Sequence, residues 1–129
     1  MIKPYKIIVL FAIIGLCACK TTKTEEPVFE IVEVMPEYPG GDEARQKFIA
    51  QNIVYPPLAI ENNKQGTVII QFVVEKDGNV SNVTAYKSFD EDCSKEAIRV
   101  VKLMKWKPGE QRGKKVRVKM LLPIKFKLK

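Results

Sequence analysis

Few side chains in this sequence are suited to catalysis. The chain has 129 residues, with cysteines only at Cys17, Cys19 and Cys93 and no histidine. Ser/His/Asp triads, Cys/His dyads and His-based metal sites therefore cannot be built from these residues alone. The carboxylates form no clustered pair, and neither a metal-ligand spacing nor a glycine-rich phosphate loop is visible. We expect no enzymatic activity, no metal and no cofactor.

Cys93 is the one cysteine within the body of the chain, and it precedes an apolar-periodic segment. A nucleophilic role would require a neighbouring base or a cationic pocket that stabilises the thiolate. Its position suits a small buried hydrophobic residue better, so we expect Cys93 to be structural.

Cys19 lies at the end of a segment typical of export signals. Lys3 and Lys6 precede twelve consecutive apolar residues at positions 7–18, fewer than the roughly 20 needed for a spanning helix. Leu16, Ala18 and Cys19 resemble a bacterial lipobox, which implies cleavage before Cys19 and lipid on its sulfur and new amino terminus. The alternative is an ordinary secretory signal peptide.

These signals divide the chain into three parts. Residues 1–18 are expected to be a lipoprotein signal peptide, residues 19–27 the lipidated cysteine with a short polar tether, and residues 28–129 one domain. Several acyl chains on one residue anchor a protein stably. We therefore expect a periplasm-facing lipoprotein of the cell envelope, with the choice between inner and outer membrane left open.

Charge is distributed unevenly along the chain. Residues 25–92 hold 13 acidic and 5 basic side chains, whereas residues 95–129 hold 13 basic and 2 acidic ones. Such a basic end suits nucleic acid, an anionic surface or an acidic peptide. Because an exported protein meets no genome, nucleic acid is not an expected partner.

The periodicity of apolar residues predicts an α+β domain. Strands are expected over residues 28–34, on both sides of Asp77-Gly78, and over residues 116–128. Helices are expected from Asp42 to about Asn52, briefly after Pro56, and after a cap at Asp92 or Ser94. Helices on one face of an antiparallel sheet give a two-layer architecture.

The last predicted strand has one apolar and one cationic face. Val116, Val118, Leu122 and the other even positions are apolar, while lysine and arginine occupy many of the odd ones. Pro123 lacks a backbone donor, and proline within a strand is confined to edges, bulges or strand ends, so we expect this strand at a sheet edge. An edge strand can accept a partner peptide. The segment expected to do so consists of Val116, Arg117, Val118, Lys119, Met120, Leu121 and Leu122.

Residues 35–128 resemble the C-terminal domain of the TonB family, in the form common among Bacteroidota. The motifs are "PEYPGG", "YPPLA", "QGTVIIQFVVEKDGNV" and "EAIRVVKLMKWKPGEQRGKKVRVKMLLPIKF". We expect the matching residues to build the domain rather than to bind ligand. They are Tyr55, Pro56, Ala59, Gly66, Asp77, Gly78, Ala97, Trp106, Pro108, Gly109, Gly113, Pro123 and Phe126.

The resemblance implies a three-stranded antiparallel sheet packed on two helices, with a short N-terminal strand as an addition. It also implies that the last strand pairs with the TonB-box peptide of outer-membrane receptors during uptake of siderophores, cobalamin or glycans. Full energy transducers of this family carry a spanning helix with a Ser-x-x-x-His motif and a Pro-rich spacer, and the sequence shows neither. Two alternatives remain: a structural module whose basic face binds peptidoglycan or an anionic surface, and a homodimer formed through the open edge.

Overall fold

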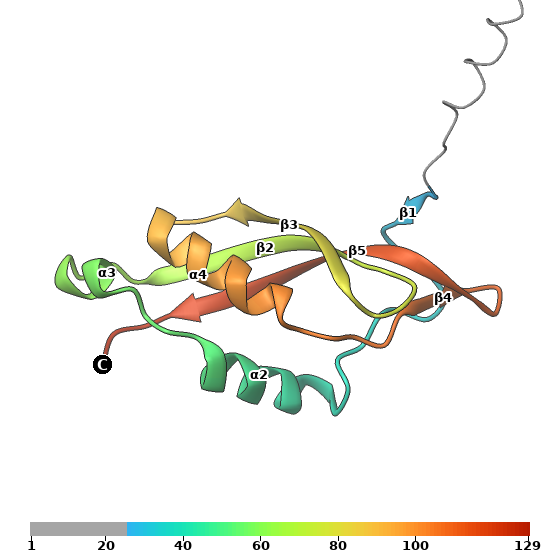
Figure 1. Cartoon of the computed structure of the whole chain (residues 1–129), viewed down its shortest axis with the longest axis horizontal. Coiled ribbons are helices and arrows are strands. Elements are labelled where there is room, and N and C mark those ends of the chain that lie inside the picture. Colours follow the sequence, from blue (N-terminus) through green and yellow to red (C-terminus); the bar gives the residue numbers. More distant parts are fainter. Residues whose placement is uncertain (1–25) are drawn as a thin grey trace, which may run out of the picture.

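The computed structural model describes residues 26–129, so the predicted signal peptide, Cys19 and most of the predicted tether lie outside the described residues. The first half of the described chain contains β1 (Val28–Phe29), α2 (Gly41–Asn52), α3 (Pro57–Glu61) and β2 (Gly66–Val74). The second half contains β3 (Val80–Lys87), α4 (Glu91–Lys102), β4 (Gly109–Gln111) and β5 (Lys114–Phe126). Figure 1 shows β2 and β5 as the two long strands, with α4 running alongside them and α2 beneath α4 in that view.

The sheet has the order β1-β5-β2-β3, and β4 also pairs with β5. β2 lies antiparallel to both β3 and β5, with Val74 opposite Val118 and Gly66 opposite Phe126. The predicted α+β architecture of antiparallel strands and helices is confirmed. The sheet contains two further short strands, β1 and β4, and the domain has three helices.

The core lies between β2, β5 and α4. Val68, Ile70, Phe72 and Val74 of β2 are fully buried, so every second residue of this strand lies in the core. Each fully buried valine or phenylalanine side chain stabilises the fold by about 1.5–3 kcal/mol. The buried residues of the other two elements are Cys93, Ala97, Val100, Val101, Val118, Leu122, Ile124 and Phe126.

Helix α4 begins two to four residues earlier than the predicted caps, Asp92 or Ser94, would place it. The Asp90 carboxylate accepts a hydrogen bond from the Cys93 N–H at 3.0 Å, so Asp90 is the N-cap rather than Asp92 or Ser94. Glu91 and Asp92 then occupy the first turn, where acidic groups stabilise the helix dipole. The predicted amphipathic face is present, with Ala97 and Val101 directed into the core.

The β2–β3 turn has the conformation predicted for Asp77-Gly78. Gly78 has a φ of 88°, a left-handed value that glycine adopts at little cost. The Asp77 carboxylate accepts a hydrogen bond from the Asn79 N–H at 3.0 Å, and the Glu75 N–H donates to the Asn79 carbonyl oxygen at 2.8 Å. These bonds fix the register of the hairpin.

Within residues 26–129, no helix is both long enough and apolar enough to cross a membrane.

Candidate functional site

The outer edge of β5 has two different environments along its length. Val118 pairs with Val74 of β2 on one side and with Phe29 of β1 on the other. Beyond Val118, residues 119–126 pair with β2 only, among the described residues. We call the outer side of residues 119–126 the β5 edge. Because backbone N–H and C=O groups are strong hydrogen-bonding groups, this edge is suited to adding a further strand.

The structure divides the predicted partner-binding segment into two parts. Val116 lies opposite Gly109 of β4, and Arg117 lies opposite Val28 of β1. With Val118, these first three residues therefore already have neighbours within the chain. The remaining four lie on the β5 edge: Lys119, Met120, Leu121 and Leu122.

The side chains along the β5 edge alternate between the core and solvent. Leu122 and Ile124 are buried, whereas Leu121 is 51% exposed. Lys125 and Pro123 are also exposed. An added strand would therefore meet a cationic and partly apolar outward face. Because Pro123 has no N–H, the unbroken series of backbone N–H donors along β5 ends at Leu122.

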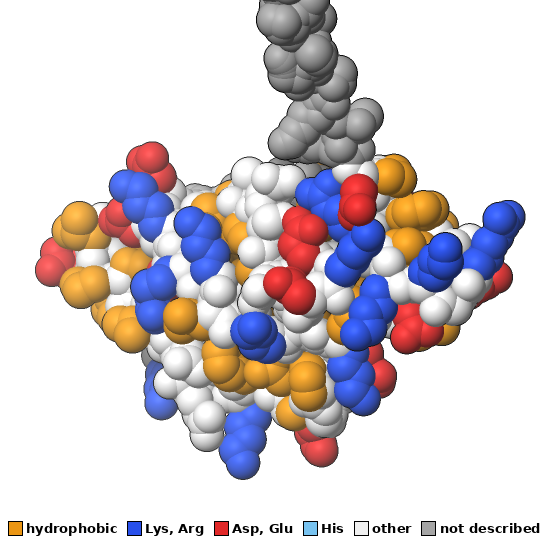
Figure 2. Space-filling view, turned by 45° about the vertical axis from the view of Figure 1, so that its right-hand side comes forward, with side chains coloured by type: hydrophobic (Ala, Val, Ile, Leu, Met, Phe, Trp, Pro, Cys, Tyr) orange, Lys and Arg blue, Asp and Glu red, His pale blue; other side chains and the backbone are white. Residues whose placement is uncertain are grey.

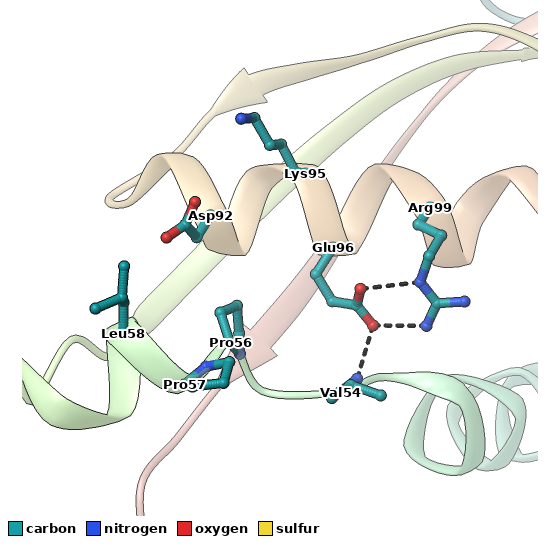
Figure 3. A pocket seen from close by; sticks show the side chains of 8 residues that line it. All are labelled: Val54, Pro56, Pro57, Leu58, Asp92, Lys95, Glu96 and Arg99. Atoms are coloured by element: carbon teal, nitrogen blue, oxygen red, sulfur yellow. Dashed lines mark hydrogen bonds and ion pairs between the residues drawn. The ribbon is translucent and has the colours of Figure 1, made fainter.

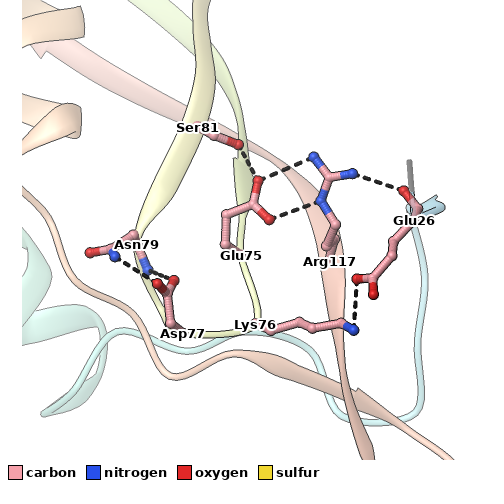
Figure 4. A network of polar contacts seen from close by, with 7 residues as sticks. All are labelled: Glu26, Glu75, Lys76, Asp77, Asn79, Ser81 and Arg117. Carbon is pink, nitrogen blue, oxygen red and sulfur yellow. Dashed lines mark hydrogen bonds and ion pairs between the residues drawn. The ribbon is translucent and has the colours of Figure 1, made fainter. Parts of the chain in front are cut away.

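A polar network joins the start of β5 to the β2–β3 hairpin (Figure 4). Arg117 Nε lies 2.8 Å from Glu75 Oε1 and Arg117 Nη2 lies 3.2 Å from Glu75 Oε2, which makes a two-pronged ion pair. The Ser81 hydroxyl also donates to Glu75. Burial by itself would raise the pKa of Glu75, but the hydrogen bonds from Arg117 and Ser81 outweigh it and hold that pKa below its ordinary value.

The same arginine reaches the N-terminal segment. Arg117 Nη1 donates to the Glu26 carbonyl oxygen at 2.8 Å, and Lys76 Nζ lies 2.6 Å from the Glu26 carboxylate. Figure 4 shows Arg117 between Glu75 on one side and Glu26 on the other. Arg117 thus holds Glu26, the residue before Pro27 and β1, against the first half of β5.

Residues 51–128 match the family model described as "Gram-negative bacterial TonB protein C-terminal". The chain belongs to the TonB C-terminal domain family. It is 32% identical over 75 residues to "Protein TonB" of Xanthomonas campestris pv. campestris, in both strain B100 and strain ATCC 33913. That match covers 57% of this chain and 34% of each relative, so the chain spans about a third of their length.

The fold is also similar to a solved domain of this family. The NMR solution structure of Helicobacter pylori TonB-CTD (residues 179–285) has a TM-score of 0.52 and 24% sequence identity to this chain. The similarity covers 65% of this chain and 77% of that one. It supports the two-layer TonB-CTD-like fold predicted from the sequence.

The aromatic residues of the TonB motif lie in the core. Trp106 is 6% exposed, and its ring centroid lies 5.5 Å from that of Phe72. Tyr55 and Phe126 meet edge to face at 5.5 Å, and the Tyr55 hydroxyl donates to the Lys64 carbonyl oxygen. Ala59 and Ala97 are buried as well. These TonB-motif residues hold the domain together, and none of them lies on the outward face of the β5 edge.

The glycines and prolines of the TonB motif occupy turns and close approaches. A Cβ on Gly109 would lie 2.7 Å from Val118 Cγ2, so β4 can approach β5 only with glycine at this position. A Cβ on Gly66 would lie 2.8 Å from the Phe89 ring. Gly113 turns the β4–β5 hairpin, Pro56 precedes the first residue of α3, and Pro108 is half-buried beside β4.

A hollow between α3 and α4 was not predicted from the sequence. It has a volume of about 500 Å³, and Figure 3 shows Pro56, Pro57 and Leu58 facing α4 across it. Glu96 accepts the Val54 N–H at 2.7 Å and pairs with Arg99 at 2.6 Å. Since both charges are engaged within the chain, the Glu96–Arg99 pair fastens the segment after α2 to α4. The contact joins residues 42 positions apart, which sequence periodicity does not reveal.

Cys93 lacks the features of a reactive thiol. It is fully buried, and burial followed by the hydrogen bond with Asp90 raises its pKa to about 12. A thiol with this pKa remains protonated at neutral pH. In the described part of the chain, no group of three or more acidic or cysteine side chains could hold a metal ion.

Proposed function

We propose that this domain is a peptide-binding module of the TonB-dependent transport system. It would engage the TonB-box peptide of outer-membrane receptors by strand addition to the β5 edge, during uptake of siderophores, cobalamin or glycans. The observation that carries the proposal is the β5 edge itself, which has no strand partner within residues 26–129. Family membership supports the TonB system as the setting.

Strand addition gains affinity from main-chain hydrogen bonds and specificity from alternate side chains. Lys125 is exposed, Lys119 is half-buried and pairs with Glu30, and both would favour acidic residues in the peptide. Leu121 offers an apolar contact between them. The proposed site is thus a backbone ladder with a mildly cationic face.

We also propose that Cys19 carries the lipid that tethers the domain to a membrane, with the domain facing the periplasm. The lipobox-like residues Leu16, Ala18 and Cys19 support this part of the proposal. The tether after Cys19 is short, so the domain would work near the membrane that holds the lipid.

Two N-methylated peptides test strand addition without altering the protein. A synthetic TonB-box peptide is prepared with N-methyl groups on its odd residues or on its even residues, and each is titrated onto the full chain in detergent. Because a strand presents alternate N–H groups to opposite sides, only one of the two should lose binding. Equal affinity of both peptides would contradict strand addition.

The second candidate function is binding of peptidoglycan or an anionic surface. The excess of basic residues over positions 95–129 favours it, and Figure 2 shows Lys and Arg side chains spread across one face around hydrophobic groups. Raising the salt concentration separates the two functions, because surface charge binding is screened whereas backbone pairing resists. Dimerisation through the β5 edge is a third outcome, to be detected by a concentration-dependent mass in solution.

A further inference from the structure

The segment before and after β1 already binds β5 in a defined way. β1 runs parallel to β5, with Val28 opposite Arg117 and Phe29 opposite Val118. Glu30 follows β1, and its carboxylate lies 3.0 Å from Lys119 Nζ. Glu26 precedes β1, and it is held by Arg117 and Lys76. An acidic residue therefore lies on each side of the two residues that pair with β5: Glu26 is separated from Val28 only by Pro27, and Glu30 directly follows Phe29.

The surroundings of this segment are cationic. A hollow of about 290 Å³ is lined by Glu26, Pro27 and Phe29 on one side and by the basic residues Lys76, Lys114, Lys115 and Arg117, with Val116, on the other. Lys114 and Lys115 are exposed and have no ion pair among the described residues. An acidic group entering this hollow would be attracted by more than one positive charge.

The contacts that hold β1 are two ladder residues and polar contacts at the surface, in which Arg117 and Lys76 bind Glu26 and Lys119 binds Glu30. The strand is two residues long, Val28 is 40% exposed, and the Lys119–Glu30 pair has side-chain exposures of 37% and 73%. Exposed ion pairs contribute about 0–1 kcal/mol each, and two ladder residues add little more. A peptide that binds β5 more strongly could therefore replace β1 with little loss of free energy.

We propose that residues 26–30 are an intrachain ligand of the β5 strand and that an incoming peptide displaces them. The partner is an extended segment parallel to β5, with acidic residues flanking two apolar ones. When β1 leaves, the strand-addition site grows from residues 119–126 to include Arg117 and Val118. This inference rests on the proposed function and adds the orientation, charge pattern and register of the partner.

The first test needs no peptide. Phe29→Pro removes a ladder residue of β1, and Ile31→Pro is its matched control because Ile31 lies outside β1 and is 84% exposed. In the full chain, those N–H groups of residues 117–119 that face β1 should exchange about tenfold faster in Phe29→Pro, in proportion to the loss of β1 pairing. Their exchange should stay unchanged in Ile31→Pro, and equal rates in the two variants would overturn the inference.

The second test uses the chain's own sequence as probe. A synthetic peptide EPVFEIV, equivalent to residues 26–32, is titrated onto the full-length wild type and both variants. It should bind Phe29→Pro about tenfold more tightly than wild type, because the competing segment no longer reduces the fraction of open sites. The charge-reversed probe KPVFKIV should bind more weakly. A probe that binds wild type and Phe29→Pro equally would overturn the displacement.

A milder substitution guards against misfolding. Glu30→Gln keeps the backbone and removes the ion pair with Lys119, so the probe should bind about two- to threefold more tightly than to wild type. Glu43→Gln, on the exposed surface of α2, is the control and should leave probe binding unchanged. No difference between these two variants would contradict a role for Glu30.

The same titrations separate this inference from the proposed function. If EPVFEIV binds Phe29→Pro whereas a TonB-box peptide binds no form of the chain, the intrachain ligand stands and the receptor partner is wrong. If the TonB-box peptide binds wild type and Phe29→Pro with equal affinity, the receptor partner stands and displacement of β1 is wrong.

Discussion

Gly78 and Trp106 meet backbone to backbone. The Trp106 N–H donates to the Gly78 carbonyl oxygen at 2.9 Å, and a Cβ on Gly78 would lie 2.3 Å from the Trp106 carbonyl oxygen. This contact joins the β2–β3 turn to the segment that follows α4. Because the Trp106 side chain packs on Phe72 in the core, the turn and the core are positioned together.

Gly78→Ala should therefore strongly destabilise the domain. The new methyl group meets backbone that cannot rotate away, and the φ of 88° is itself unfavourable for alanine. Together these effects should lower the free energy of unfolding by about 3 kcal/mol. Urea unfolding followed by the fluorescence of Trp106, the single tryptophan of the chain, measures the change.

Gly113→Ala is the matched control for this substitution. Gly113 has a φ of 76°, but a Cβ at this position would have no atom within 4 Å. Only the unfavourable backbone conformation of alanine should therefore destabilise this variant. The expected loss is about 1 kcal/mol. If the two variants lost equal stability, the close approach of Gly78 to Trp106 would not matter.

The Glu75–Arg117 pair should make stability depend on pH. The pKa of Glu75 is lowered from 4.5 in the folded chain, so the pair stabilises the fold above the unfolded pKa and this stability is lost as pH falls through the folded pKa. Glu75→Gln should cost about 1 kcal/mol at neutral pH. The difference from wild type should shrink as the pH falls below 4.5 and through the folded pKa of Glu75.

Unfolding by urea at several pH values measures this effect. Glu61→Gln, which alters an exposed carboxylate at the end of α3, serves as control and should stay within about 0.5 kcal/mol of wild type at neutral pH. A pH-independent difference between Glu75→Gln and wild type would mean that the carboxylate charge is not what stabilises the network.

Alternation of apolar residues was sufficient to predict the long strands. Val68, Ile70, Phe72 and Val74 repeat every second residue and are all buried. The same period places Leu122, Ile124 and Phe126 in the core. A strand in a two-layer sheet buries one face, so its alternate residues are apolar and the pattern is visible in the sequence whichever strands pair with it.

The strand β4, and the extent and pairing of β1, could not be predicted in the same way. β4 is the polar segment Gly109–Gln111, and β1 covers only Val28–Phe29 of the predicted strand over residues 28–34. Beyond β1 the chain leaves the edge, because the Val34 N–H bonds to the Glu110 carbonyl oxygen. Pairing between residues that are distant in the chain produces no periodic pattern in the sequence. For this reason Val116, Arg117 and Val118 were expected on an open edge, whereas β1 and β4 pair with them.

The Cys93 thiol should resist alkylation until the domain unfolds. With a pKa of about 12, its thiolate is far rarer at pH 8 than that of a free cysteine, and the side chain is fully buried. Iodoacetamide should modify Cys93 at least about 10³-fold more slowly in the native chain than in urea. Mass spectrometry of the Cys93 peptide measures the rate, with glutathione as the reference thiol. A native rate close to that of glutathione would show an accessible thiolate.

The proposed lipid on Cys19 can be tested against a cysteine two residues away. Cells expressing the full chain are fed a clickable fatty acid, and the protein is captured and scored for label. Cys17→Ser should keep the label, because residue 17 falls within the predicted signal peptide and is removed. Cys19→Ser should lose it, together with membrane association. If the wild type were exported without label, residues 1–18 would be an ordinary secretory signal, and the domain would reach its partners unanchored.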